Sequence, residues 1–225
     1  NNDIYDNVVC NNKTTDFSVD TSSTGNSGDN NTCDLPDGWN DAGTTGCTSL
    51  CSGSTTCDSC ANCTNRLNGT FDRVVLTADI NNYNGTCITF GASNVEFNCD
   101  GHTLDGDDSG TDYGVSISGH SGNTVRQCTI TDFYRGLYLN NADNNTLTWN
   151  TVDSNTYDGI YLSGSSGNDI SWSEIGSNGQ YGISLYNSPS NQVYANDLLC
   201  NDRGIRLNGS NSNTINLNDV CSSGG

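Results

Sequence analysis

Cysteines are the most reactive side chains in this sequence, and several stand in one closely spaced run. Cys57, Cys60 and Cys63 recur at three-residue intervals, with Cys47 and Cys51 shortly before them. This spacing suits zinc or an iron–sulfur cluster, which take four soft ligands in a reducing compartment. The even total of 12 cysteines favours disulfides in an exported chain instead. The residues expected in disulfides are Cys10, Cys33, Cys47, Cys51, Cys57, Cys60, Cys63, Cys87, Cys99, Cys128, Cys200 and Cys221.

An acidic turn offers oxygen ligands for a hard cation. Asp105, Asp107 and Ser109 occupy positions 1, 3 and 5 of a calcium loop, with a glycine at position 6. The full motif needs a bidentate Glu at position 12, where this chain has Ser116, so Asp112 is the substitute ligand. Calcium at Asp105, Asp107, Ser109 and Asp112 competes with the simpler interpretation of a solvated acidic turn.

Residues suited to acid–base catalysis are few. Asp107, Asp108 and His120 are the candidates for glycoside hydrolysis. A lyase would place a Lys or Arg base beside calcium-binding acids, and the one lysine, Lys13, stands near the N-terminus. We therefore expect no enzymatic activity.

The charge balance excludes several partner classes. The 225 residues include 26 Asp and Glu against 7 Lys and Arg, a net charge of −19. Such a field repels phosphate backbones and anionic membranes, so neither nucleic acid nor membrane insertion is expected. Abundant Asn, Asp, Gly, Ser and Thr favour short strands and tight turns over helix.

Glycosylation sequons support an extracellular, cell-surface location. Their asparagines are Asn12, Asn30, Asn62, Asn68, Asn84, Asn144 and Asn208. Each sequon alone is weak, because Asn-rich chains produce them by chance. Together with the even number of cysteines they indicate an exported glycoprotein.

A repeat of 22–23 residues organises the chain from Tyr113 onward. It is marked by Gly114, Gly136, Gly159, Gly182 and Gly204, and nine residues later by Asn123, Asn145, Asn168, Asn191 and Asn213. Alternating apolar residues follow each glycine and each asparagine. This alternation predicts short strands that bury one face, with bends at Gly and Asn.

Three short strands in each repeat make one coil of a right-handed parallel β-helix, an all-β solenoid whose coils stack about 4.8 Å apart. Leucine-rich repeats have a similar length, but their consensus is missing here. Stacking aligns equivalent residues, so the asparagines are expected to form a hydrogen-bonded ladder that Asn94 begins. Asn150, Asn196 and Asn218 predict a second, partial ladder.

Aromatic residues recur with the coils as well. Tyr113, Tyr134, Tyr157 and Tyr181 precede the repeat glycines, and Trp149 and Trp172 stand one coil apart. Stacking that stabilises the coils is the simpler interpretation, and a platform for sugar rings is the alternative.

The N-terminal part divides differently. Residues 11–65 are polar and Cys-rich without periodicity, which predicts a disulfide-stapled loop inserted near the N-terminus. Residues 2–10 superimpose on residues 213–221 at a constant offset of 211, matching Asn, Ile, Asn, Val and Cys. The predicted organisation is a partial coil at 1–10, the Cys-rich insertion at 11–65 and the β-helix at 66–225.

Residues 87–225 resemble the right-handed parallel β-helix repeat family. That family includes pectate-lyase-like proteins, periplasmic copper-site maturation proteins and archaeal surface proteins. The tract Asn98-Cys-Asp-Gly-His-Thr-Leu-Asp-Gly resembles an early coil of the family. The segments Asn31-Thr-Cys-Asp-Leu-Pro-Asp-Gly-Trp-Asn-Asp and Gly46-Cys-Thr-Ser-Leu-Cys are similar to inserts in archaeal members. The resemblance is specific for fold and leaves function open, since the fold hosts enzymes, adhesins and scaffolds.

Neither end of the repeat shows a capping segment in the sequence, and open solenoid ends expose unpaired strands. We therefore expect a structural subunit of a surface filament, stalk or sheath, a head-to-tail homopolymer that stacks end to end. The alternatives are a carbohydrate-binding or adhesive module with a polysaccharide or glycan partner, and a polysaccharide lyase or hydrolase. The expected assembly edges contain Ile4, Val9, Ile205, Leu207, Ile215 and Val220.

Overall fold

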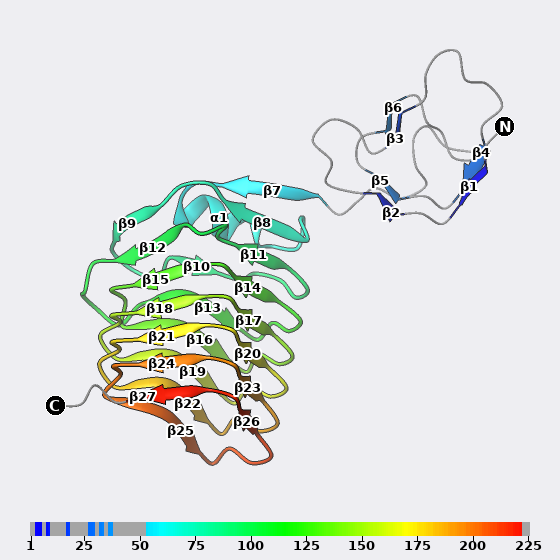
Figure 1. Ribbon diagram of the computed structural model, residues 1–225. Coiled ribbons are helices and arrows are strands. Elements are labelled where there is room, and N and C mark those ends of the chain that lie inside the picture. Colours follow the sequence, from blue (N-terminus) through cyan, green and yellow to red (C-terminus); the bar gives the residue numbers. More distant parts are fainter. Residues whose placement is uncertain are drawn as a thin grey trace. The chain divides into compact units, whose positions relative to one another are not determined.

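The computed structural model describes residues 53–221 and, as backbone strands, six short segments nearer the N-terminus. It divides into two compact units, Asn1–Ser54 and Thr55–Gly225, each of which is described by itself. The second unit is a stack of coils (Figure 1). Among the described residues, no helix is long and apolar enough to cross a membrane.

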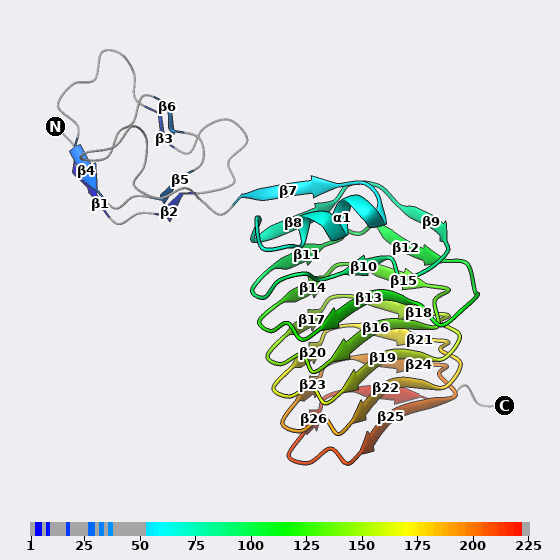
Figure 2. The ribbon, with the colours of Figure 1, turned by 180° about the vertical axis from the view of Figure 1, so that it is seen from behind.

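Three parallel sheets run along the second unit, and Figure 2 shows the same stack from behind. The first contains β10 (Ile88–Thr89), β13 (Tyr113–Ser118), β16 (Arg135–Asn140), β19 (Asp158–Ser163), β22 (Tyr181–Tyr186) and β25 (Arg203–Asn208). The second contains β7 (Ser54–Cys57), β8 (Arg73–Leu76), β11 (Glu96–Asn98), β14 (Thr124–Arg126), β17 (Thr146–Thr148), β20 (Asp169–Ser171), β23 (Gln192–Tyr194) and β26 (Thr214–Asn216). The third contains β9 (Ile80–Tyr83), β12 (Thr103–Gly106), β15 (Thr129–Thr131), β18 (Thr151–Asp153), β21 (Glu174–Gly176), β24 (Asp197–Leu199) and β27 (Asp219–Cys221).

This architecture confirms the predicted right-handed parallel β-helix. Each coil contributes one strand to each sheet, and equivalent residues pair in register, as Leu137, Ile160 and Ile183 do. These inward positions are fully buried, so the apolar alternation along each strand builds one continuous core. The repeat glycine is needed because a Cβ at Gly159 would lie 2.8 Å from the carbonyl oxygen of Gly182.

The asparagine ladder is confirmed, and it has a direction. The backbone N–H of Asn145 donates to Oδ1 of Asn168 at 2.8 Å, and that of Asn168 donates to Oδ1 of Asn191 at 2.8 Å. Every rung therefore needs an acceptor side chain from the coil that follows it. One prediction was wrong by a residue: the N–H of Val95, and not that of Asn94, donates to Oδ1 of Asn123.

The predicted second ladder is also present, with other residue types at two rungs. Cys128 N–H donates to Oδ1 of Asn150, whose own N–H donates to Oγ of Ser173. Ser173 N–H donates to Asn196, and Asn196 N–H donates to Asn218. A buried rung thus requires a side-chain oxygen, which serine supplies as well as asparagine.

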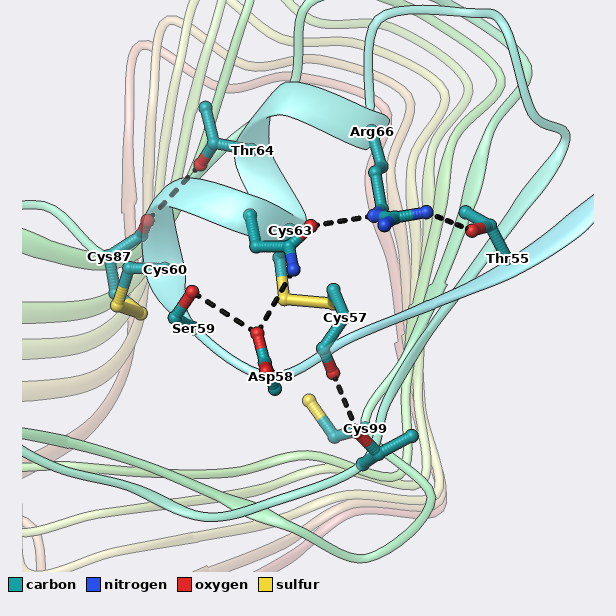
Figure 3. The surroundings of a disulfide bond; sticks show 12 residues. Thr55, Cys57, Asp58, Ser59, Cys60, Cys63, Thr64, Arg66, Cys87 and Cys99 are labelled. Atoms are coloured by element: carbon teal, nitrogen blue, oxygen red, sulfur yellow. Dashed lines mark hydrogen bonds between the residues drawn. A yellow bond between two sulfur atoms is a disulfide. The ribbon is translucent and has the colours of Figure 1, made fainter.

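Helix α1 (Cys60–Arg66) covers the N-terminal end of the stack (Figure 1), so the expectation that neither end is capped is wrong. The disulfide Cys57–Cys63 links α1 to the end of β7, and the disulfide Cys60–Cys87 links it to the residue just before β10 (Figure 3). Cys60, Cys63 and Leu67 are buried against the first coil. A short helix with no apolar period of its own is therefore held by covalent links and by packing.

The unit boundary differs from the predicted organisation. The second unit begins at Thr55, so residues 55–65 belong with the β-helix and not with the predicted 11–65 insertion. Cys57, Cys60 and Cys63 are bridged and do not form a metal site. Cys60 pairs outside the closely spaced run, with Cys87.

In the first unit, strand backbones pair in parallel. β1 (Asp3–Tyr5) pairs with β4 (Ser27–Asp29), β2 (Val8–Val9) with β5 (Thr32–Cys33), and β3 (Phe17–Ser18) with β6 (Pro36–Asp37). β1 and β2 coincide with β26 and β27 at the offset of 211, as expected. The predicted sites at Cys10, Asn12, Asn30, Cys47 and Cys51 lie outside the described residues.

Candidate functional site

The last coil, made of β25, β26 and β27, is here called the edge coil. Its inward positions repeat those that are buried in every preceding coil, but no coil follows them within the described residues. Leu207 is 49% exposed, Ile215 38% and Val220 51%, whereas their neighbours Leu185, Val193 and Leu198 are buried. Ile205, the fourth predicted edge residue of this coil, is half-buried. The edge coil therefore presents an apolar surface at the end of the stack.

The backbone of the edge coil is open as well. Asn213 and Asn218 accept ladder hydrogen bonds from Asn191 at 2.7 Å and Asn196 at 3.0 Å. Their own N–H groups have no ladder acceptor among residues 53–221. On the other predicted edge, Ile4 and Val9 lie in β1 and β2, each of which pairs on one side only in the strands described.

The predicted ligands of the acidic turn are held by hydrogen bonds to the preceding coil and to one another. Asp105 accepts the N–H of Asn82 at 2.9 Å, and Asp107 accepts Nδ2 of Asn84 at 2.6 Å and the hydroxyl of Ser109 at 2.8 Å. These donors, with Asn84 the strongest, hold the pKa of Asp107 below its usual value. Among the described residues, no group of three or more His, Cys, Asp or Glu could hold a metal ion.

Asp112, the fourth residue assigned to calcium, is nearly buried and takes a structural part. Its Oδ2 accepts the N–H of Gly85 at 3.1 Å, and its Oδ1 accepts the N–H of Tyr134 at 3.3 Å. It thus joins the coil before it to the coil after it. Calcium binding at the turn stays a prediction.

The candidate catalytic residues are not brought together. Asp107 and Asp108 follow β12, whereas His120 follows β13, and no hydrogen bond or ion pair joins them in the described part of the chain. His102 instead lies 3.0 Å from Asp79 through Nδ1. The structure provides no acid–base pair at these positions.

Tyrosines surround one arginine on the first sheet. Arg135 lies 3.9 Å from the ring centroid of Tyr161 and pairs with the buried carboxylate of Asp158 at 3.0 Å. Burial raises the pKa of Asp158, and the Arg135 guanidinium opposes that rise. Tyr134 stacks on Tyr157 as expected, but Tyr113 stacks on Tyr138, which pairs in register with Ser116, three residues after Tyr113.

Trp149 and Trp172 form an exposed aromatic ridge. Their rings stack at a centroid distance of 5.5 Å, and 60% and 51% of the two residues is exposed. Tyr194 meets Trp172 edge-on at 6.4 Å. Both tryptophans have positive φ, 56° and 52°, a conformation that costs a bulky residue about 1–3 kcal/mol.

Cysteines at the C-terminal end differ from the prediction that all twelve are bridged. Cys99 and Cys128 pair between two coils, but Cys200 and Cys221 carry exposed free thiols. Cys221 ends β27 of the third sheet, and Cys200 follows β24 and lines a groove together with Asp153, Glu174, Asp197 and Leu199. Six of the described cysteines are in disulfides as predicted, whereas Cys200 and Cys221 are not.

The sequons on described residues lie mainly on the surface. Asn68, Asn84, Asn144 and Asn208 are exposed, although Asn84 donates to Asp107. Asn62 lies in α1, where it donates to Asp58 at 3.0 Å and accepts from Arg66 at 2.6 Å. Exposure makes the first four accessible, and their occupancy stays a prediction.

Comparison with known proteins agrees with the fold. A family model described as "Periplasmic copper-binding protein (NosD)" matches residues 44–223. The crystal structure of an alginate lyase from Paenibacillus sp. str. FPU-7 is similar with a TM-score of 0.60 and 14% identity. The similarity covers 73% of this chain and 75% of that enzyme, and at such low identity it concerns the fold alone. No curated protein matches the chain.

Proposed function

The chain belongs to the NosD family, named for periplasmic copper-binding proteins, and from this premise we propose that it is an exported structural β-helix that assembles end to end through its edge coil. The observation that carries the proposal is the repetition of the edge strands. β26 and β27 recur as β1 and β2 at the offset of 211, so one chain carries the same strand pair at both predicted edges.

The polarity of the two edges is compatible. β26 pairs with β23 of the preceding coil and has its later side open, whereas β1 pairs with β4 of the following coil. A second copy can therefore place β1 after β26 and β2 after β27 with all strands parallel. Such a head-to-tail contact repeats without closing and produces a filament.

Side chains favour the same register. In the next copy, the offset places Asn2 and Asn7 at the ladder positions after Asn213 and Asn218. Their amide oxygens would accept the two open N–H groups, each of which is worth about 1 kcal/mol when paired. Ile4 and Val9 of the next copy would stand over Ile215 and Val220, where burial contributes about 25 cal/mol per Å².

A charge in the edge coil tests the proposal. Val220→Lys is expected to abolish end-to-end assembly, because the joint would bury an unpaired ammonium group. Asn216→Lys is the matched control, since it adds the same charge at an exposed, outward-facing position of the edge coil and should still assemble. Sedimentation velocity and negative-stain microscopy measure the result. Wild-type protein that stays monomeric at micromolar concentration overturns the proposal.

The family name implies copper, so we tested the described residues as a copper site. Copper favours thiolate, thioether and imidazole ligands. The chain has no Met, its two His are separated, and His102 is engaged with Asp79. Cys200 and Cys221 supply two thiols with no third strong ligand grouped beside them in the described region. These residues do not fit a copper centre, and no step of the proposal uses one.

The exposed tryptophan ridge favours a second candidate function, carbohydrate binding. The two stacked tryptophans are 60% and 51% exposed and together present a flat aromatic surface of the kind that sugar rings can contact. Arg126, which pairs in register with Thr148 beside Trp149, is engaged with Glu96 at 2.8 Å, and the chain carries a net charge of −19, so a neutral glycan is favoured over an acidic one.

We expect Trp149→Ala combined with Trp172→Ala to weaken binding of a soluble neutral β-glucan about tenfold or more, since each aromatic contact is worth about 0.5–1.5 kcal/mol. Tyr186→Ala removes another exposed aromatic residue and is the control. Isothermal titration calorimetry measures the affinities. If the double variant bound the glucan as tightly as the control, the proposal that the tryptophan ridge binds carbohydrate would be wrong.

A further inference from the structure

Cys200 and Cys221 lie on neighbouring coils in an arrangement that permits a direct bond. Leu199 of β24 pairs in register with Cys221 of β27, and Cys200 is the next residue after Leu199. Adjacent strands lie about 4.8 Å apart and residues about 3.3 Å apart along a strand, so the diagonal Cα–Cα distance is about 6 Å. Disulfides span Cα–Cα distances of about 4.4–6.8 Å.

The same chain uses coil-to-coil disulfides elsewhere. Cys99 and Cys128 bridge two coils with a Cα–Cα distance of 4.7 Å, and both residues are buried. Cys200 and Cys221 differ from Cys99 and Cys128 in one respect: they are exposed.

We propose that Cys200 and Cys221 are a reversible dithiol–disulfide pair that fastens the edge coil to the coil before it, and that the structure describes its reduced form. Exposed disulfides are more readily reduced than buried ones, which suits a regulatory bond. The pair encloses residues 201–220, which include β25 and β26 and most of the exposed apolar surface of the edge coil. Oxidation would restrict this segment to the coil geometry.

The reaction is a thiol–disulfide exchange with a small-molecule or protein disulfide of the exported compartment. The thiolate of one cysteine attacks the disulfide, forming a mixed disulfide and releasing one thiol of the oxidant. The second cysteine then attacks the mixed disulfide and releases the other thiol. Two cysteine thiols are oxidised, one external disulfide is reduced, and the two protons pass to the released thiolates.

The surroundings of Cys221 make its thiol slow to react. The Asp219 carboxylate accepts a hydrogen bond from Sγ of Cys221 at 3.3 Å and raises the pKa of that thiol, with a further contribution from Cys200. A raised pKa leaves less of the reactive thiolate at neutral pH, so uncatalysed oxidation of Cys221 is slow and oxidation by a specific disulfide exchange partner is favoured.

Tryptic mapping tests the pair directly. Cleavage after Arg135, Arg203 and Arg206 releases peptide 136–203, whose one cysteine is Cys200, and peptide 207–225, whose one cysteine is Cys221. After treatment of the full chain with oxidised glutathione, the two peptides are expected as one linked species in a non-reducing digest. Graded dithiothreitol should separate them before it releases the Cys128 peptide, 127–135.

Cys200→Ser and Cys221→Ser are the controls, and each should abolish the linked species. The proposal is overturned if both peptides stay alkylatable after oxidation, or if Cys221 links instead to peptide 1–13 of another copy. It is also overturned if the bond resists dithiothreitol as long as the Cys99–Cys128 bond does, because the pair would then be an ordinary structural disulfide.

The expected effect on assembly rests on the proposed function. If the chain assembles end to end, the oxidised chain should form filaments at a lower protein concentration than the reduced chain. Peptide mapping on monomeric protein is independent of that function. If the linked peptides form but the protein never assembles, the redox pair is supported and the proposed end-to-end assembly is wrong. If filaments form without the link, the assembly is supported and the redox pair is wrong.

Discussion

Replacing Ile160 by aspartate should lower the free energy of unfolding by about 3–5 kcal/mol, enough to unfold much of the stack. Ile160 is fully buried and pairs in register with Leu137 before it and Ile183 after it. The carboxylate would have no partner, and the neighbouring coils cannot move apart without breaking the ladders on both sides. Urea unfolding followed by circular dichroism measures the change.

Ser163→Asp is the matched control for this substitution. Ser163 lies on the same strand, β19, but on the outward face, and is partly exposed. It should change the stability by less than about 0.5 kcal/mol. If Ile160→Asp were tolerated as well as Ser163→Asp, the assignment of the inward face would be wrong.

Replacing Asn168 by alanine should cost about 2–4 kcal/mol through the ladder alone. Oδ1 of Asn168 accepts the N–H of Asn145 at 2.8 Å and Nδ2 of Asn145 at 3.1 Å, and all of these groups are buried. Alanine removes the acceptor and leaves the Asn145 N–H without a partner. Asn168→Ser should cost less, because Ser173 already performs this role in the second ladder.

The control for Asn168 is Asn208→Ala, which makes the same truncation at an exposed position of β25 whose side chain makes no hydrogen bond. Chemical denaturation of the three variants should rank Asn168→Ala as the least stable, then Asn168→Ser, then Asn208→Ala. If the Asn168→Ala protein were as stable as the control, the ladder would contribute nothing measurable to stability. The expectation that the ladder stabilises the end-to-end joint between two copies would then be wrong.

The ladder also explains why the two ends of the stack are different. Because each N–H donates to the following coil, the N-terminal end needs no acceptor from another coil and can be closed by α1. The edge coil ends with open donors at Asn213 and Asn218 and with exposed Ile215 and Val220. An end of this kind is chemically suited to another coil of the same pattern, which is the basis of the proposed joint.

The cap shows a feature that the sequence did not reveal. Helix α1 has seven residues, and its fastening depends on Cys60 reaching Cys87, 27 residues later. Cys57 and Cys63 pair within the run, but nothing in its spacing indicates that Cys60 pairs outside it. Which cysteine lies opposite which is set by the stacking of coils, and so the connectivity could not be predicted.

The sequence by itself determined the coil, its length, its inward face and two of its ladders. Each of these features follows from residues that recur every 22–23 positions, so the local sequence pattern is sufficient to predict it. Only the tertiary structure decided the capped end, the pairing of Cys60 with Cys87, the Tyr113–Tyr138 stack and the exposed neighbours Cys200 and Cys221. These features depend on side chains that different coils bring together, and a contact across coils depends on register and on the size of each neighbouring residue.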